Sequence, residues 1–213
     1  MAGILIRLFA LLFAWQMTSA HGAPEDDYRA GSQAFRRGDV VEAMAMLKKS
    51  ADVGHAPSQA LLAYILDKAE FNEEAVAYYR KAAAQGDADG ELGLGSMLAA
   101  GDGVKRDADE ARKWITRAAE KGHTGAINVL AQAYIKGELG IDEAQRKGPE
   151  ALRWVRRAAD ANHPSALEQL ASAYRTGGYG LALDPKQAEV LEAKARAARG
   201  IVEKPAAKKK DKK

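Results

Sequence analysis

The sequence predicts an all-α protein, an α-solenoid in which helix-turn-helix repeats stack on one another. Three observations support this fold class. A nine-residue pattern recurs along the chain, a stripe of apolar residues follows each copy at helical spacing, and alanine is plentiful while the 213 residues include only 6 prolines. Alanine has the highest helix propensity. A single helical hairpin cannot bury both of its apolar stripes, so neighbouring hairpins are expected to stack.

The nine-residue pattern has the form of a helix ending. It consists of a large apolar residue, three residues, two small residues, two more residues and then Gly or Asn. The clear copies are Tyr78–Gly86, Trp114–Gly122 and Trp154–Asn162, and a weaker copy is Met46–Gly54. The large residue and the first small residue are four apart and therefore share one helix face. Gly and Asn are the residue types that end helices in the left-handed conformation, so a helix is expected to end at each copy.

A second helix is predicted to follow each of these endings. Positions four, eight, nine and twelve residues after the terminal Gly or Asn are small or apolar, which traces one stripe of a helix. The position eight residues on is leucine in every repeat: Leu62, Leu94, Leu130 and Leu170. The position twelve residues on is Leu66, Leu98, Tyr134 or Tyr174. Each repeat is therefore predicted to contain a first helix (helix A), a turn of variable length, and a second helix (helix B) that ends at the Gly or Asn.

The turn between helices A and B carries the most specific motif. Residues 98–114 read L-A-A-G-D-G-V-K-R-D-A-D-E-A-R-K-W, with Gly101, Gly103, Val104, Asp107, Ala111 and Trp114 at the key positions. This motif resembles the loop signature of the Sel-one-like repeat family, a branch of the tetratricopeptide-like helical repeats. Looser copies begin at Gly137 and Gly177. The resemblance covers roughly residues 56–199, whereas residues 26–54 look more like a plain tetratricopeptide unit.

The domain organisation expected from these patterns has four parts. Residues 1–20 read as a signal peptide, because a short apolar run, Leu8–Trp15, precedes the small residues Thr18-Ser19-Ala20. Cleavage is expected after Ala20, which would place the protein in a periplasm or outside the cell with no integral membrane span. Residues 24–54 form the tetratricopeptide-like unit, residues 55–200 the Sel-one-like repeats with a terminal capping helix, and residues 201–213 a lysine-rich tail.

The basic charge of the chain is concentrated in this tail. Lys204–Lys213 contains six lysines and one aspartate, whereas the whole chain has a net charge of +3, so the folded part is slightly acidic. A nucleic-acid partner is therefore not expected, since such proteins usually carry a basic stripe on the fold itself. The tail is predicted to be disordered because its like charges repel. It could contact an anionic component of the cell envelope, or it could simply be a solubilising end.

The histidines, aspartates and aromatic residues that could suggest a metal or catalytic site are instead predicted to have structural roles. With 0 cysteines the chain has no disulfide or thiolate metal site. His55, His123 and His163 each follow a helix ending, and Asp87 takes the same place in the remaining repeat, so these residues are predicted to cap helix N-termini and not to bind a metal. Asp107 and Asp184 are likewise predicted caps, and the recurring aromatics Tyr78, Trp114, Trp154, Tyr134 and Tyr174 are predicted core residues.

No combination of residues suggests an enzyme or a cofactor site. Gly101-Asp102-Gly103 lacks the phosphate-loop pattern G-x-x-x-x-G-K-[ST]. No Ser-His-Asp set or pair of carboxylates stands out. The protein is therefore predicted to be non-catalytic, without a cofactor or a metal. The remaining alternatives are an envelope- or glycan-binding module and, less favoured, a cell-wall or antibiotic-modifying hydrolase.

The resemblance implies that helix A lines a concave groove that binds a protein partner. The groove positions are those that lie off the core stripe of each helix A. They hold Arg29, Gln33, Arg36, Arg37, Tyr64, Lys68, Asn128, Gln132, Lys136, Glu168, Ser172 and Arg175, together with Asp67, Leu92, Ser96, Ile135 and Thr176. Because this set leans basic, an acidic peptide or loop is a possible partner, although a merely solvated face is the alternative. The functional prediction is an exported scaffold or adaptor.

Overall fold

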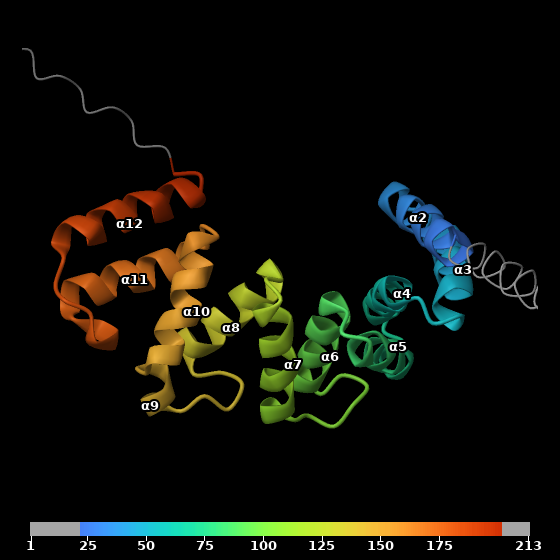
Figure 1. Cartoon of the computed structure of the whole chain (residues 1–213), viewed down its shortest axis with the longest axis horizontal. Helices are drawn as coiled ribbons and strands as arrows, with labels where there is room; N and C mark the ends of the chain where they lie inside the picture. Colours follow the sequence, from blue (N-terminus) through green and yellow to red (C-terminus); the bar gives the residue numbers. More distant parts are fainter. Residues whose placement is uncertain (1–21, 202–213) are drawn as a thin grey trace, which may run out of the picture. The chain divides into compact units, whose positions relative to one another are not determined.

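The computed structural model describes residues 22–201, and every regular element among them is a helix (Figure 1). The helices are α2 (Gly22–Arg37), α3 (Val40–Asp52), α4 (Ala56–Lys68), α5 (Asn72–Ala84), α6 (Ala88–Ala100), α7 (Ala108–Glu120), α8 (Thr124–Lys136), α9 (Glu143–Arg146), α10 (Pro149–Asp160), α11 (Pro164–Thr176), the 3-10 turn η1 (Gly178–Gly180) and α12 (Pro185–Ala198). The all-α prediction is confirmed. The predicted signal peptide and Lys204–Lys213 lie outside the described residues.

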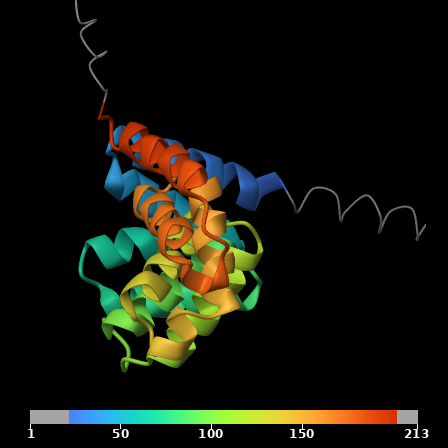
Figure 2. The ribbon, with the colours of Figure 1, turned by 90° about the vertical axis from the view of Figure 1, so that its left-hand side faces the viewer.

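Residue contacts divide the chain into two units, which are described separately. The described part of unit 1, residues 22–123, contains the hairpins α2–α3, α4–α5 and α6–α7, and each hairpin packs against the next. The first helices of these hairpins also touch one another, α2 against α4 and α4 against α6. In unit 2, α10 packs between α8 and α11, and α12 lies beside α11 (Figure 2). Between residues 22 and 201 no helix is both long and apolar enough to cross a membrane.

The turns from helix B to the next helix A share one backbone conformation. Gly54, Gly86, Gly122 and Asn162 have φ angles of 98°, 81°, 88° and 60°, in the left-handed region. The residue after each of them donates its N–H to a carbonyl five residues earlier, for example His163 N to the carbonyl oxygen of Ala158 at 2.9 Å. This is the hydrogen-bond pattern of a Schellman helix end. The helix ends predicted from the nine-residue pattern are therefore confirmed.

The apolar stripe of helix A forms the core together with the alanines of helix B. The leucines eight residues after each helix end are exposed by no more than 7%. Helix B contributes pairs of buried alanines, such as Ala82 and Ala83 on α5. The small residues let the helices approach closely: a Cβ on Gly90 of α6 would lie only 2.5 Å from the Cβ of Ala82. A larger side chain at either position would force α5 and α6 apart.

The turns between helices A and B vary in length, unlike the helices that they join. Four of the first helices, α4, α6, α8 and α11, have 13 residues each. The connecting segments grow from residues 69–71 to 101–107 and then to 137–148, which contains α9; the last, 177–184, contains η1. Asp107 and Asp184 cap the helices that follow, accepting backbone N–H groups at 2.8 and 3.0 Å as predicted. Insertions are thus confined to the turns and leave the length of these four helices unchanged.

The predicted histidine caps are only partly confirmed. His55 and Asp87 each accept the backbone N–H three residues later, at 3.4 and 2.8 Å. His163 stands at the same position of α11 but makes no side-chain cap bond, so that prediction was wrong. His123 has its Nε2 at 2.8 Å from a carboxylate oxygen of Asp89, on the preceding helix A. These histidines start or connect helices, and the described residues contain no group of three or more His, Asp and Glu side chains that could hold a metal ion.

The predicted core aromatics fall into two groups. Tyr134 and Trp154 are buried, whereas Tyr78, Trp114 and Tyr174 are half-buried. The core prediction was therefore wrong for the second group. At Trp114 the reason is visible: the Arg117 guanidinium lies 4.5 Å from the centre of the ring, and the indole N–H donates to the Glu110 carboxylate at 3.3 Å. The ring lies at the edge of the helix stack, where a cation covers its face.

Candidate functional site

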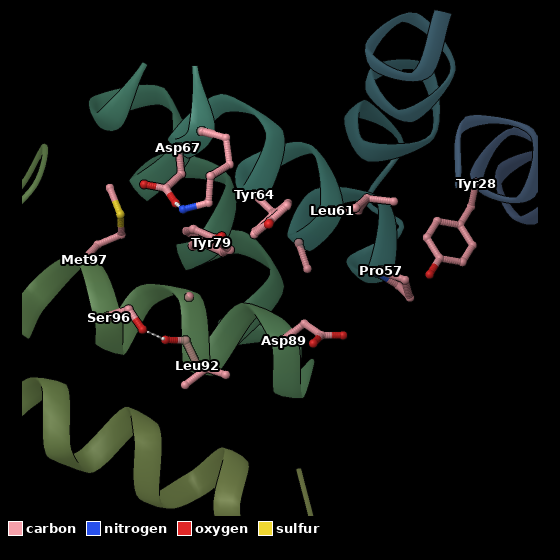
Figure 3. Close-up of a pocket in the computed structure, with 13 residues that line it drawn as sticks. Tyr28, Pro57, Leu61, Tyr64, Asp67, Tyr79, Asp89, Leu92, Ser96 and Met97 are labelled. Atoms are coloured by element: carbon pink, nitrogen blue, oxygen red, sulfur yellow. Dashed lines mark hydrogen bonds and ion pairs between the residues drawn. The ribbon is translucent and has the colours of Figure 1, made fainter. Parts of the chain in front are cut away.

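A cavity of about 460 Å³ lies between two consecutive A helices of unit 1 (Figure 3). We call it the α4–α6 groove. From α4 it is lined by Pro57, Ala60, Leu61, Tyr64, Asp67 and Lys68; from α6 by Asp89, Leu92, Gly93, Ser96 and Met97; and from α2 and α5 by Tyr28 and Tyr79. Five of the predicted groove positions are among these residues: Tyr64, Asp67, Lys68, Leu92 and Ser96. Residues predicted from the pattern in two different repeats therefore line the same cavity.

The floor of the groove is formed where α5 approaches α6. The ring of Tyr79 is only 5% exposed and lies against Gly93 so closely that a Cβ there would be 2.1 Å from the ring. Burial raises the pKa of the Tyr79 phenol well above its usual value, so the group stays protonated. With Leu92 and Met97 beside it, the ring provides an apolar floor whose shape depends on the absence of a side chain at Gly93.

The rim of the groove is polar and already organised by internal contacts. Tyr64 is 42% exposed and packs edge-on against Phe35 of α2, with ring centres 6.1 Å apart. The Lys68 ammonium lies 5.4 Å from the centre of the Tyr64 ring and donates a hydrogen bond to Asp67 at 3.1 Å. This bond to Asp67 raises the pKa of Lys68. An exposed aromatic ring thus stands beside a neutralised ion pair.

The charges that line the groove do not repeat the basic excess seen among the predicted positions. The charged lining residues are Asp67, Lys68 and Asp89. Lys68 is paired with Asp67, and Asp89 is paired with His123. The arginines of α2 are not lining residues. The acidic-partner prediction therefore gains no support from the α4–α6 groove.

The predicted residues of α2 form an exposed face outside the groove. Gln33 and Arg36 are exposed, as are Arg29 and Arg37. Arg29 is paired with Glu25 of its own helix at 3.0 Å. Arg37 is paired with two carboxylates at the start of α3, at 3.3 and 3.4 Å. Two of the three predicted arginines are thus engaged in exposed local ion pairs, which contribute little stability.

The predicted residues of unit 2 have mixed surroundings. Asn128 and Gln132 of α8 are half-buried, and Lys136 is exposed. Glu168 and Arg175 of α11 form hydrogen bonds with residues on or directly after α12. Arg199 donates to Glu168 at 2.7 Å, and Arg175 donates two hydrogen bonds to Glu192 at 2.8 and 2.9 Å. These two residues connect α11 to α12, a role that the repeat pattern alone did not indicate.

A second cavity, of about 430 Å³, lies within unit 2 and includes the predicted residues Ile135, Ser172 and Thr176. We call it the α9 cavity. It is lined by Tyr134 and Ile135 of α8, Glu143, Arg146 and Lys147 at α9, Gln169, Ser172, Ala173 and Thr176 of α11, and residues 177–180. Its charged residues and Tyr179 come from the two longest turns between helices A and B. These turns depart from the regular length of the repeat, and no binding site is predicted in them from the sequence.

One constellation in unit 1 has the form of a catalytic triad, which the sequence analysis did not find. Glu25 Oε2 lies 3.3 Å from His55 Nε2, and His55 Nδ1 lies 2.9 Å from the Ser58 hydroxyl oxygen. Hydrolases use a carboxylate, an imidazole and a hydroxyl in this order. However, Ser58 has no exposed surface, and its hydroxyl donates to Ser50 at 2.8 Å. In this position the hydroxyl cannot meet a substrate, and the chain of bonds joins α2, α3 and α4.

A buried carboxylate in unit 1 is a further feature that the sequence does not predict. Glu91 on α6 has no exposed surface, and its two oxygens lie 3.0 Å from Arg117 and 2.8 Å from Lys121. Lys121 also donates to the carbonyl of Gly86 at 2.6 Å. This cluster connects α6 and α7 to the turn before α6. Glu91 follows Gly90 in an ordinary polar stretch of the sequence, so its burial had no signal in the pattern.

Comparison with known proteins extends these observations. In sequence, the chain is 34% identical over 107 residues to the chitin synthase regulator SKT5 of Saccharomyces cerevisiae, covering 47% of this chain and 15% of the yeast protein. The chain thus spans only a small part of that relative. Among solved structures it is similar to c5321, a protective antigen of uropathogenic Escherichia coli with an SLR fold, at 27% identity and a TM-score of 0.72. That match covers 84% of this chain and 39% of the antigen.

Two further solved structures share the fold. A Sel1 repeat protein of Oxalobacter formigenes is 26% identical with a TM-score of 0.64, covering 89% of this chain and 74% of that one. A Sel1 repeat protein of Klebsiella pneumoniae is 18% identical with a TM-score of 0.57, over 88% of this chain and 92% of that one, and shows the fold alone. The likeness confirms the helical-repeat solenoid class. The Sel1 repeat profile matches residues 28–55, 72–87, 88–123 and 125–163, more than half of the sequence, so the chain belongs to the Sel1 repeat family.

Proposed function

We propose that this protein is an exported scaffold that holds a segment of a protein partner in the α4–α6 groove. The Sel1 repeat is generally a non-catalytic scaffold for protein interaction. The observation that carries the proposal is the cavity of about 460 Å³ between consecutive A helices, with an apolar floor at Tyr79 and Leu92. A concave apolar site with a few polar groups at its edge is the usual form of a binding site.

The groove favours a partner segment with one large apolar side chain. Such a side chain would bury itself on the Tyr79 floor, and the Tyr64 ring would pack against its flank. Interfaces commonly draw most of their binding energy from one or two such anchors in a pocket. The paired charges of Asp67 and Lys68 would remain at the rim. The apolar floor would disfavour a charged residue at the anchor position, because the charge would lose its hydration without gaining a partner.

The groove proposal can be tested by site-specific crosslinking in the compartment where the protein resides. A photo-crosslinking residue at Ser96, which lines the groove and is exposed, is expected to trap a discrete partner. The same residue at Arg80, which is exposed on α5 and does not line the groove, is the matched control. Adding Leu92→Arg should abolish the Ser96 product because it places a charge on the apolar floor. Equal trapping from both positions, or trapping that survives Leu92→Arg, would contradict the groove.

Export is proposed from the sequence of residues 1–20. The apolar run Leu8–Trp15 followed by Thr18-Ser19-Ala20 supports a cleavable signal and a periplasmic location. The test is fractionation of cells that express the full chain, followed by mass determination of the purified product. A mature protein that begins at His21 in the periplasmic fraction is expected. A cytoplasmic protein that retains Met1 would contradict export and would leave the groove proposal standing.

A further inference from the structure

The α9 cavity is produced by two departures from the repeat. The segment 137–148, which contains α9, and the segment 177–184, which contains η1, are the longest connections between helices A and B among the described residues. Both segments supply residues that line the same cavity. The helices that carry them, α8 and α11, keep the standard 13 residues. Insertions of this kind commonly carry function because they do not disturb the core.

A strained residue stands at this cavity. Tyr179 has φ 56° and ψ 18°, which is the left-handed conformation that favours glycine. The residues on either side of it, at 178 and 180, are glycines, whereas this position carries a large side chain. A side chain other than glycine in this region costs free energy, and such strain is concentrated at functional sites. A fourth glycine would have relieved the strain. The turn instead places a phenol at the wall of the cavity.

The phenol of Tyr179 is prepared to donate a hydrogen bond. Its oxygen accepts a hydrogen bond from the Gln169 side-chain amide at 3.0 Å. Burial raises the pKa of this phenol, so the oxygen keeps its proton near neutral pH. A phenol that already accepts one bond and keeps its proton offers that proton to an acceptor. The cavity thus presents a donor at Tyr179, and the hydroxyl of Ser172 is also at its wall.

The charged residues of the cavity leave an excess of positive charge. Arg146 is held by two bonds, one to the carbonyl of Ile135 at 2.7 Å and one to Glu143 at 2.9 Å. Lys147 pairs with the same carboxylate at 2.8 Å. One carboxylate therefore serves two cations, and the lining carries one more positive than negative charge. The two bonds hold Arg146 in place before any ligand arrives, whereas the Lys147 side chain is 74% exposed and can turn toward a ligand.

We propose that the α9 cavity binds the oxyanion of a small molecule, a carboxylate or a phosphate. The excess positive charge attracts the anion, Lys147 and Tyr179 donate to its oxygens, and Arg146 contributes charge from its fixed position. A volume of about 430 Å³ suits a ligand of small-metabolite size. A neutral sugar would leave the excess charge without a counterion. This site lies wholly within unit 2 and is independent of the α4–α6 groove.

The test is isothermal titration calorimetry of the full chain with three probes. Succinate and inorganic phosphate represent the two oxyanions, and glucose is the neutral probe. Saturable binding of at least one anion and none of glucose is expected, and the tighter anion identifies the group. Tyr179→Phe should weaken binding about tenfold, since it removes one donor to a charged acceptor while keeping the ring. Lys147→Gln should weaken binding by a similar factor.

Two further variants distinguish binding in this cavity from nonspecific attraction of anions to surface lysines. Glu143→Gln removes the competing negative charge and should tighten binding. The uncharged Tyr179 phenol separates the two cases, because nonspecific attraction depends on charge alone and would not respond to Tyr179→Phe. The matched control is Lys186→Gln at the exposed start of α12, which makes the same charge change as Lys147→Gln and should leave binding unaltered. The proposal would be overturned by no saturable anion binding, by glucose binding equally well, or by anion binding that is indifferent to Tyr179→Phe. Circular dichroism would verify that each variant is folded.

Discussion

The carboxylate of Glu91 lies 2.8 Å from the ammonium of Lys121, and the same ammonium donates to the carbonyl of Gly86. Glu91 is entirely buried, whereas the Lys121 side chain is 40% exposed. The Lys121 side chain therefore reaches from the surface and places its ammonium beside a carboxylate inside the helix stack. The same ammonium also donates a hydrogen bond to the carbonyl of Gly86, just after α5 ends. One interaction closes the turn between two repeats and neutralises the buried group.

Glu91→Ala should destabilise unit 1. Removing the carboxylate leaves Arg117 and Lys121 without their common partner and leaves a void between α6 and α7. Losing one member of a buried ion pair commonly costs about 3–5 kcal/mol. Because both cations keep solvent contact, we expect a cost of roughly 2–3 kcal/mol. The measurement is urea unfolding, with Glu74→Ala on the exposed face of α5 as the control. A loss no larger than that of the control would show that the cluster adds no stability.

The contact between α11 and α12 should weaken in acid. Two hydrogen bonds from Arg175 lower the pKa of the Glu192 carboxyl below its usual 4.5. A lowered folded-state pKa means that this contribution is fully present above pH 4.5 and is lost as the pH falls through the folded-state value. The melting temperature of the wild type should therefore fall more between pH 6 and pH 3 than that of Glu192→Gln. Thermal melts followed by circular dichroism would detect this, and parallel pH profiles would show that the pair contributes nothing.

Helix ends and core stripes could be predicted from the sequence because they depend on local geometry. A left-handed helix end requires Gly or Asn, as at Gly86 and Asn162, and a buried stripe requires leucine at helical spacing, as at Leu130. Both requirements recur in every repeat and reinforce one another. The same helical spacing also predicted which residues of α4 and α6 line the α4–α6 groove, because Tyr64 and Ser96 occupy positions outside the core stripe.

Contacts between residues distant in the chain could not be predicted in this way. Glu25 meets His55 through packing of α2 on α4, and Arg175 meets Glu192 across a turn of unusual length. The half-exposure of Trp114 depends on where its repeat lies in the stack, which its motif does not specify. The α9 cavity depends on two insertions that break the period, so a search for periodicity passes over it.

Gly93→Ala should change the floor of the α4–α6 groove. The added Cβ would lie 2.1 Å from the Tyr79 ring, which must then move or push α6 away. Overpacking of this kind costs about 1–3 kcal/mol, even though alanine has the better helix propensity. Ser96→Ala, on the same helix and exposed, is the control and should be nearly neutral. Thermal unfolding measures the loss, and Tyr79→Leu should restore part of it by making room. A Gly93→Ala protein as stable as the wild type would mean that the ring has free space.

Ser58 should be inert to serine-directed reagents in the folded protein. Its hydroxyl is buried and donates to Ser50, whose hydroxyl donates to the carbonyl of Pro24 at 2.6 Å. A fluorophosphonate probe should therefore leave Ser58 unmodified, as peptide mass spectrometry would reveal. Ser58→Ala should cost only about 1 kcal/mol, because Ala126 and Ala166 fill the equivalent position in later repeats and the main loss is one buried hydrogen bond. Stoichiometric labelling that disappears in His55→Asn would instead establish a working triad and overturn the structural role assigned to this chain of bonds.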